Sequence, residues 1–319
     1  MAPLEALEFD YPLIDSIFRL FSASRGIFTV EDFLVHDLHA LEAFAKRGNA
    51  PDKLIQGIKQ VLSIIEYQSR PWSNGLELLE NARLNKHSTG YESIDSLLQG
   101  GFREGHVTEL VGPSSSGKTQ VCLKAASHVA RKYSGTVMYF DTGNSFSPKR
   151  IAQFVCQSSD PTNTEGNNTI QHVMRSIVCH PVFDMFALLD MLHQLMSDLK
   201  SQIGYKVRML IVDSLSSLIA PVLGGSGAHG HALMVTAGFL LKELAHEHNI
   251  SVVVTNHMVG GEAGVSKPAL GESWKSIPHV RLLISRYSAT KDSTISILKH
   301  PYLATGKTAD FTVTRSIRR

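Results

Sequence analysis

The feature that most constrains this chain is the segment LVGPSSSGKTQ, residues 110–120, which matches the pattern G-x-x-x-x-G-K-[ST] from Gly112 to Thr119. The segment follows an apolar run, HVTELVG, and opens a helical pattern, KTQVCLKAASHVARKY. Glycines allow a backbone to curl until its N–H groups face a phosphate, and a helix N-terminus favours negative charge at that point. We therefore expect a polyphosphate-binding loop between a strand and a helix.

The same pattern assigns roles to side chains. Lys118 is expected to reach the β- and γ-phosphates and to act in catalysis, and the Thr119 hydroxyl is expected to ligate Mg²⁺. The apolar run VRMLIVD ends on Asp213, where a carboxylate can hold the water shell of that metal. A strand-end aspartate that only caps a turn is the alternative, but the upstream loop favours the metal role. The other phosphate-binding positions are Gly112, Pro113, Ser114, Ser115, Ser116, Gly117 and Gln120.

From about residue 88, apolar strand-like runs alternate with helical patterns. The strand-like runs are HVTELVG, TVMYFDT, VRMLIVDS, ISVVVTNH, HVRLLISR and TISILKH. Continuous β-branched runs separated by helices are typical of a parallel sheet that is covered on both faces. The sequence predicts an α/β fold with a mostly parallel sheet for residues 88–319.

Residues 1–68 have a different pattern. The segments YPLIDSIFRLF and PDKLIQGIKQVLSIIEYQ have apolar residues at helical spacing. Between them, Thr29 is a candidate N-cap and Phe33 a candidate core residue. We expect a small all-α domain at 1–68, a linker rich in polar residues at 69–87, and the α/β domain after it.

Composition excludes some classes of protein. The chain is 43% hydrophobic and 19% charged with a net charge of +2, which is typical of a globular protein and only permits nucleic-acid binding. Three cysteines without a C-x-x-C pair favour a reducing compartment over a disulfide framework. No apolar run approaches the roughly eighteen residues that span a membrane. No guanine-reading Asn-Lys-x-Asp and no Arg-rich kinase lid is present, so a nucleotide-dependent motor or clamp remains.

Four segments together resemble the core of the RecA-like recombinases. They are STGYESIDSLLQGGFREGHVTELVGPSSSGKTQVCL, VMYFDTGNSFSPKRI, MLIVDSLSSLIAP and VVVTNHMVGGEAGVSKPALGESWKSIPHVRLLISR, in that order over residues 88 to about 300. The resemblance implies an ATPase core that uses ATP and Mg²⁺. It also implies a nuclear role in homologous-recombination repair, within a hetero-oligomer of recombinase paralogues that contacts single-stranded DNA.

The resemblance also implies further site residues. The adenine-stacking arginine falls on Arg150, with a surface arginine as the alternative. The γ-phosphate sensor falls on Asn256 or His257, where the family usually has glutamine at the second position. The two DNA-binding loops fall on LGGSGAHG (223–230) and MVGGEAGVSKPALGESWK (258–275), with His229, Lys267 and Lys275 as candidate DNA contacts and Trp274 as a base-stacking side chain. The alternative is that these loops are ordinary surface loops and that Trp274 folds onto the core.

The chain departs from the family pattern at two places. The family has Asp-Thr-Glu-Gly where this chain has Asp141-Thr142-Gly143-Asn144, so the glutamate that polarises the attacking water is absent. Asp141 is the nearest substitute as a catalytic group, or it holds structure. We therefore expect ATP binding with slow hydrolysis.

The second departure concerns assembly. Where the family has Phe-x-x-Ala in the linker, this chain has Leu76 and Leu79, and a branched side chain in the alanine position disfavours long homo-filaments. Two readings follow for the whole chain: an ATP-binding mediator, or a scaffold of the same fold in which ATP is structural and partners hold the DNA.

Overall fold

A computed structural model of the chain describes residues 3–8, 11–30, 32–48, 50–68, 75–76, 85–133, 135–157, 166–200, 206–223, 228–260, 266–286 and 292–313. The chain divides into two compact units, the first mainly residues 1–78 and the second mainly residues 79–319. Most of the expected linker lies outside the described residues. Leu76 is described and is 66% exposed, whereas Leu79 is not among the described residues.

The first unit is helical and has its own apolar core, built around Phe18 and Phe33, whose rings stack 6.0 Å apart. Polar side chains fix where its helices begin. Asp15 Oδ1 accepts a hydrogen bond from Phe18 N at 2.9 Å, and the predicted cap Thr29 accepts one from Asp32 N at 3.3 Å. The elements are η1 (Leu4–Leu7), α1 (Ser16–Ala23), α2 (Asp32–Val35), α3 (Leu38–Ala45) and α4 (Pro51–Gln68).

The second unit is built on one large sheet, with strand order β11-β10-β9-β3-β7-β6-β4-β5 and β8 paired with β7. Its strands are β1 (Lys86–His87), β2 (Phe102–Arg103), β3 (Val107–Gly112), β4 (Thr136–Asp141), β5 (Ile177–Pro181), β6 (Val207–Asp213), β7 (Ser251–Gly260), β8 (Ser266–Pro268), β9 (Val280–Arg286), β10 (Asp292–Lys299) and β11 (Thr308–Thr312). Its helices are α6 (Glu92–Leu97), α7 (Lys118–Lys132), α8 (Pro148–Gln157), α9 (Gly166–Ser176), α10 (Met185–Lys200), α11 (Leu215–Leu223), α12 (Ala228–His248) and α13 (Gly271–Trp274).

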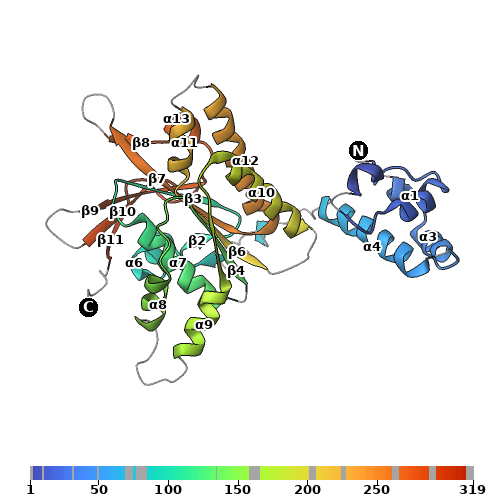
Figure 1. The fold of residues 1–319 in the computed structure, drawn as a ribbon, viewed down its shortest axis with the longest axis horizontal. Coiled ribbons are helices and arrows are strands. Elements are labelled where there is room, and N and C mark those ends of the chain that lie inside the picture. Colours follow the sequence, from blue (N-terminus) through green and yellow to red (C-terminus); the bar gives the residue numbers. More distant parts are fainter. Residues whose placement is uncertain are drawn as a thin grey trace. The chain divides into compact units, whose positions relative to one another are not determined.

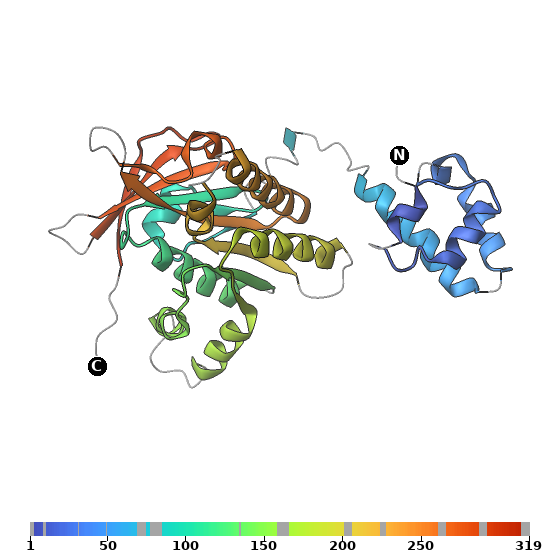
Figure 2. The same cartoon turned by 45° about the horizontal axis from the view of Figure 1, so that its top comes forward.

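In this sheet the pairs from β9 through β3, β7, β6 and β4 to β5 are all parallel, and β10, β11 and β8 pair antiparallel with their neighbours. Strands β1 and β2 form a separate antiparallel pair. Helices α7, α8 and α9 lie on one face of the sheet, and α10 and α12 lie on the other (Figures 1 and 2). This arrangement confirms the predicted α/β fold with a mostly parallel, doubly covered sheet.

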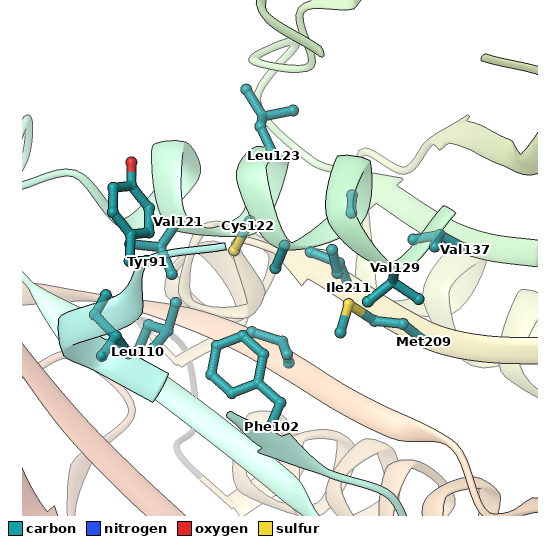
Figure 3. Close-up of a cluster of buried hydrophobic side chains, with 14 of the residues drawn as sticks. Tyr91, Phe102, Leu110, Val121, Cys122, Leu123, Val129, Val137, Met209 and Ile211 are labelled. Atoms are coloured by element: carbon teal, nitrogen blue, oxygen red, sulfur yellow. The ribbon is translucent and has the colours of Figure 1, made fainter. Parts of the chain in front are cut away.

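The core of this unit forms where α7 packs on the sheet. Its buried face, with Val121, Cys122 and Val129, lies over strand residues such as Leu110 and Ile211 (Figure 3). Burial of a complete helix face in this way fixes α7, and with it the loop that precedes the helix. The position of the phosphate loop therefore depends on apolar packing.

Several elements were not expected from sequence. Strand β5 forms the sheet edge opposite β11. Most of its residues are only partly buried, and its sequence, IVCHP, is accordingly less apolar than a buried central strand. Helix α9 begins at Gly166, inside the polar run DPTNTEGNNT, which has no apolar residues at helical spacing. The short strand β8 exists because β7 extends beyond the sheet and pairs with it from Met258 to Gly260.

A buried polar cluster crosses three adjacent strands on the face opposite α7. Glu109 of β3 accepts a hydrogen bond from Asn256 Nδ2 of β7 at 2.7 Å and forms an ion pair with Arg281 Nε of β9. The exposed fraction is 0% for Glu109 and Asn256 and 5% for Arg281. Removing one member of such a pair leaves an uncompensated buried charge, so the cluster locks the register of the three strands.

We predict that Arg281→Met lowers the free energy of unfolding by about 3–5 kcal/mol, because Glu109 is then buried without its cation. The double variant Glu109→Met/Arg281→Met is expected to regain part of that loss, since no buried charge remains. Chemical denaturation of the three proteins measures both effects. A double variant less stable than Arg281→Met alone would contradict this account.

Candidate nucleotide site

The loop between β3 and α7 has the tight backbone that phosphate binding requires. A Cβ atom on Gly112 would lie 2.4 Å from the carbonyl oxygen of Ile284 and 2.6 Å from Ser116 Oγ, so only glycine fits there. Ser115 and Gly117 have φ values of 61° and 115°, in the left-handed region. Gly117 is the N-cap of α7, and the unpaired N–H groups of the first helical turn therefore face the loop.

Lys118 is 5% exposed and folds back over this loop. Its Nζ donates hydrogen bonds to the carbonyl oxygens of Gly112 at 2.7 Å and Pro113 at 2.9 Å. Burial lowers the pKa of Lys118, and the nearby Asp213 carboxylate opposes that shift. An ammonium group that is buried with only carbonyl partners is well placed to gain a phosphate as a charged partner.

Asp213 ends β6 beside the loop and is 5% exposed. Its Oδ2 accepts a hydrogen bond from Tyr139 Oη at 2.9 Å, and its Oδ1 accepts one from Thr255 Oγ1 at 2.5 Å. Ser145 Oγ also donates to Oδ2, at 3.4 Å. These neutral donors orient the carboxylate without neutralising it, which suits a group that holds metal-bound water. Tyr139 and Thr255 were not identified from sequence, since each lies inside an apolar strand and no local motif marks it.

A cavity of about 310 Å³ opens over the loop. Its lining residues are Ser114, Ser115, Ser116, Gly117, Lys118, Thr119, Gln120, His257, Arg286, Ser293 and Val313. Ser116 Oγ and His257 Nδ1 are buried there without a hydrogen-bond partner. The unpartnered polar atoms, the buried ammonium group and the glycine cradle together fit a polyphosphate with its magnesium ion. Thr119, Asp213 and phosphate oxygens would hold the magnesium ion. Within the described residues no group of three or more His, Cys, Asp or Glu side chains forms a protein-only metal site.

The structure separates the two candidate phosphate sensors. His257 lines the cavity, and burial and then the Lys118 charge lower its pKa, so the imidazole is neutral at pH 7. Asn256 points to the other face of the sheet, where it binds Glu109. Adjacent residues of a strand face opposite sides, so only one of the two can reach the loop.

Asp141 holds structure. Its Oδ1 accepts hydrogen bonds from Gly143 N at 3.2 Å and Ser145 N at 3.0 Å, and its Oδ2 accepts one from Phe146 N at 2.9 Å. The carboxylate therefore organises the loop after β4, which favours the structural alternative over the catalytic one. Asn144 has a φ of 52°, the left-handed conformation expected where the family has glycine.

Arg150 is 7% exposed and packs on the Phe154 ring, with 4.5 Å from its guanidinium carbon to the ring centroid. Its Nε donates to Gln120 Oε1 at 2.6 Å, which ties α8 to the first turn of α7. The predicted adenine contact thus lies beside the phosphate loop, but its guanidinium is buried against an aromatic ring of the protein. Arg286 and Ser293 reach the cavity from β9 and β10, and neither was identified from sequence.

The candidate DNA contacts do not form one site. Lys267 is exposed on β8, and Lys275 is exposed and pairs with Glu272 at 2.6 Å. His229 is exposed near the start of α12, while residues 224–227 and 261–265 of the two loops lie outside the described residues. The structure corrects the prediction for Trp274, which is 0% exposed and fills a slot over Gly238 of α12. Its large apolar surface is better buried against a helix glycine than left in solvent.

Comparisons with known proteins agree with this geometry. The sequence model of the Rad51 family matches residues 81–309. The DNA repair protein RAD51 homolog 4 of Bos taurus is 35% identical over 293 residues, covering 89% of this chain and 87% of the bovine protein. The DNA repair protein RAD51 homolog 2 of Mus musculus is 28% identical over 257 residues, covering 68% and 70%. The DNA repair and recombination protein RadB of Thermococcus sibiricus is 29% identical over 174 residues, covering 54% and 67%.

We predict that Trp274→Ala lowers the free energy of unfolding by about 3–5 kcal/mol, because it empties a buried slot. The matched control Lys275→Ala removes an exposed side chain and is expected to change stability by less than about 0.5 kcal/mol. Urea denaturation followed by circular dichroism measures both. A Trp274→Ala protein as stable as the parent that binds single-stranded DNA less tightly would restore the base-stacking role.

Proposed function

This chain belongs to the Rad51 family, and on that premise we propose that it is an ATP-binding mediator of homologous-recombination repair. It acts on single-stranded DNA within a hetero-oligomer of recombinase paralogues in the nucleus. The observation that supports this most directly is the cavity over the phosphate loop, where buried Lys118 accompanies two unpartnered polar atoms and is acted on by the nearby Asp213 carboxylate. We also propose that the chain is a counterpart of RAD51 homolog 4, the D paralogue of the strand-exchange recombinase, since the match covers most of both chains.

The protein holds ATP with little hydrolysis. ATP supplies the transferable γ-phosphoryl group, and Mg²⁺ neutralises its developing charge. The chain contributes loop N–H groups, Lys118 and the oriented carboxylate of Asp213. It lacks a carboxylate at Gly143, and Asp141 is engaged by the backbone of its own loop, so no acidic group of the described loop is available to accept the proton of water.

The described residues also favour a second reading, a scaffold in which ATP is structural. The Asp141 carboxylate accepts hydrogen bonds from its own loop and thereby orders it. Arg150 donates to Gln120 and contributes to the packing of α8. A nucleotide held in such a site would stabilise the folded state by an amount that grows with the logarithm of its concentration divided by its Kd. In cells, a Lys118→Ala protein that still supports repair would select the scaffold over the mediator.

We predict that Lys118→Ala weakens binding of magnesium ATP by at least about tenfold, because a charge-assisted hydrogen bond contributes about 1.5–3 kcal/mol. Isothermal titration calorimetry on the full chain measures the change. The matched control is Lys149→Ala, which removes an exposed lysine just after the start of α8. Equal affinity in Lys118→Ala and the parent would disprove the site.

We predict that Gly143→Glu raises ATP turnover by about 10²-fold or more, the usual contribution of a general base. Gly143 is exposed, and a Cβ there would meet nothing within 4 Å, so the loop accepts the change. Gly143→Gln is the matched control, since it has the same size but takes up no proton. Released phosphate is measured with and without single-stranded DNA. Equal turnover in the Glu and Gln variants would contradict the assignment of position 143.

A further inference from the structure

A second cationic region lies at the amino ends of the parallel strands, the end of β3 opposite the phosphate loop. His106 precedes β3 and His279 precedes β9, and their rings stack 4.7 Å apart. Strand β10 runs antiparallel to β9, so its last residues return to the same edge. We call this region the amino-edge patch and define it as Arg103, His106, Lys242, His279, Lys299 and His300.

The charges that act on the three histidines of the patch are all positive. Burial lowers the pKa of His106 and His279 to about 4 and also lowers that of His300. The neighbouring charges add to each of these shifts, because all of them are basic groups such as Arg103 and Lys242. A region of unbalanced positive potential attracts a polyanion.

The nearest carboxylates are already engaged. Glu104 pairs with His87 at 2.9 Å and with Arg208 at 3.6 Å, and Glu109 pairs with Arg281 in the buried cluster. Neither forms an ion pair with a patch side chain among the described residues. Glu109 acts on Lys299 electrostatically, but its own ion pair is with Arg281, so the patch keeps an excess of positive charge.

The hydrogen-bond donors of the patch are fixed in place. His279 Nδ1 accepts from Val107 N at 2.9 Å, and His300 Nδ1 accepts from Tyr302 N at 3.3 Å. A neutral imidazole that accepts at Nδ1 has its proton on Nε2, so both rings are N–H donors without being charged. Lys299 Nζ is held by the carbonyls of Lys275 at 3.0 Å and Pro278 at 2.7 Å.

An exposed aromatic ring lies next to these donors. Tyr302 is 51% exposed, and its ring meets the His300 ring edge-on at 4.4 Å. Cations such as Arg103 and Lys242, together with neutral N–H donors and an exposed aromatic ring, suit single-stranded nucleic acid, with phosphates on the cations and a base on the ring. An acidic peptide would satisfy the cations but would give the ring no stacking partner.

We propose that the amino-edge patch is a binding site for single-stranded DNA, with Tyr302 stacked on a base and Arg103 and Lys242 on phosphates. The site lies at the opposite ends of the strands from the starts of the Gly-rich loops that follow β6 and β7, and it meets the second loop only at its last residue, where Lys299 Nζ donates to the carbonyl of Lys275. The proposal rests on the proposed function only in its choice of single-stranded DNA as the partner.

The test uses the full chain and a fluorescein-labelled oligothymidylate, with anisotropy titrations between about 50 and 200 mM salt. Arg103→Gln/Lys242→Gln should lower the slope of log affinity against log salt by about 1.4, since each phosphate contact contributes about 0.7. Tyr302→Ala should weaken binding by about tenfold, and Tyr302→Phe should not, because stacking needs only the ring. Lys267→Gln on β8 is the control for a site at the loops.

Unchanged affinity and slope in the patch variants, with a loss in Lys267→Gln, would overturn the patch and leave the proposed function standing. A parent protein that binds no oligothymidylate would overturn the patch together with the DNA-binding part of that function. Polyglutamate that displaces the oligothymidylate more effectively than unlabelled DNA would assign the patch to an acidic protein and overturn it.

Cross-linking of the unmodified protein covers the case in which a variant does not fold. An oligothymidylate with 5-iododeoxyuridine is irradiated on the parent chain, and the cross-linked peptides are identified by mass spectrometry. A peptide that contains Tyr302 is expected. Cross-links confined to other segments would overturn the proposal.

Discussion

The parallel pairing of β3 with β7, and of β7 with β6, is the constraint on which the rest of the structure depends. It places the ends of three strands at one edge, so that Gly112, Asp213 and His257 meet although they lie far apart in the sequence. The pairing is held by apolar packing on the α7 face and by the Glu109 cluster on the other. One register slip would turn Thr255 away from Asp213 and Asn256 away from Glu109 at the same time.

This geometry is better suited to binding phosphate than to cleaving it. The elements for binding are buried and specified by several contacts: the glycine cradle, Lys118 on two carbonyls, and Asp213 between hydroxyl donors. The loop that would supply a base is exposed at Gly143, and its one carboxylate, Asp141, is directed at its own backbone. Binding and turnover depend on different loops, so a change in one need not alter the other.

Sequence predicted the fold well because its signals are local. The buried parallel strands are continuous apolar runs, and the phosphate loop is one contiguous motif between a strand and a helix. Sequence predicted less of what depends on distant pairing. Strand β5 has a weak apolar signal at the sheet edge, and Tyr139, Thr255 and Arg286 contribute to the site only because the sheet brings them there. The family resemblance places Trp274 in a DNA-binding loop, whereas the structure buries its side chain over Gly238.

The segment from β8 to β9 connects the two edges of the sheet. It begins at Ser266, beside the end of β7, and reaches His279 at the start of β9. Trp274 anchors its middle in the core, and Lys299 fixes the carbonyls of Lys275, Ser276 and Pro278 near its end. Buried hydrogen bonds hold β3 and β7 in place. Among the described residues, this segment is therefore the surface path along which a structural change at the nucleotide edge would reach the amino-edge patch. Its buried anchor opposes such a change, so the proposed ATP site and the proposed DNA site are better suited to simultaneous occupation than to exchanging one ligand for the other.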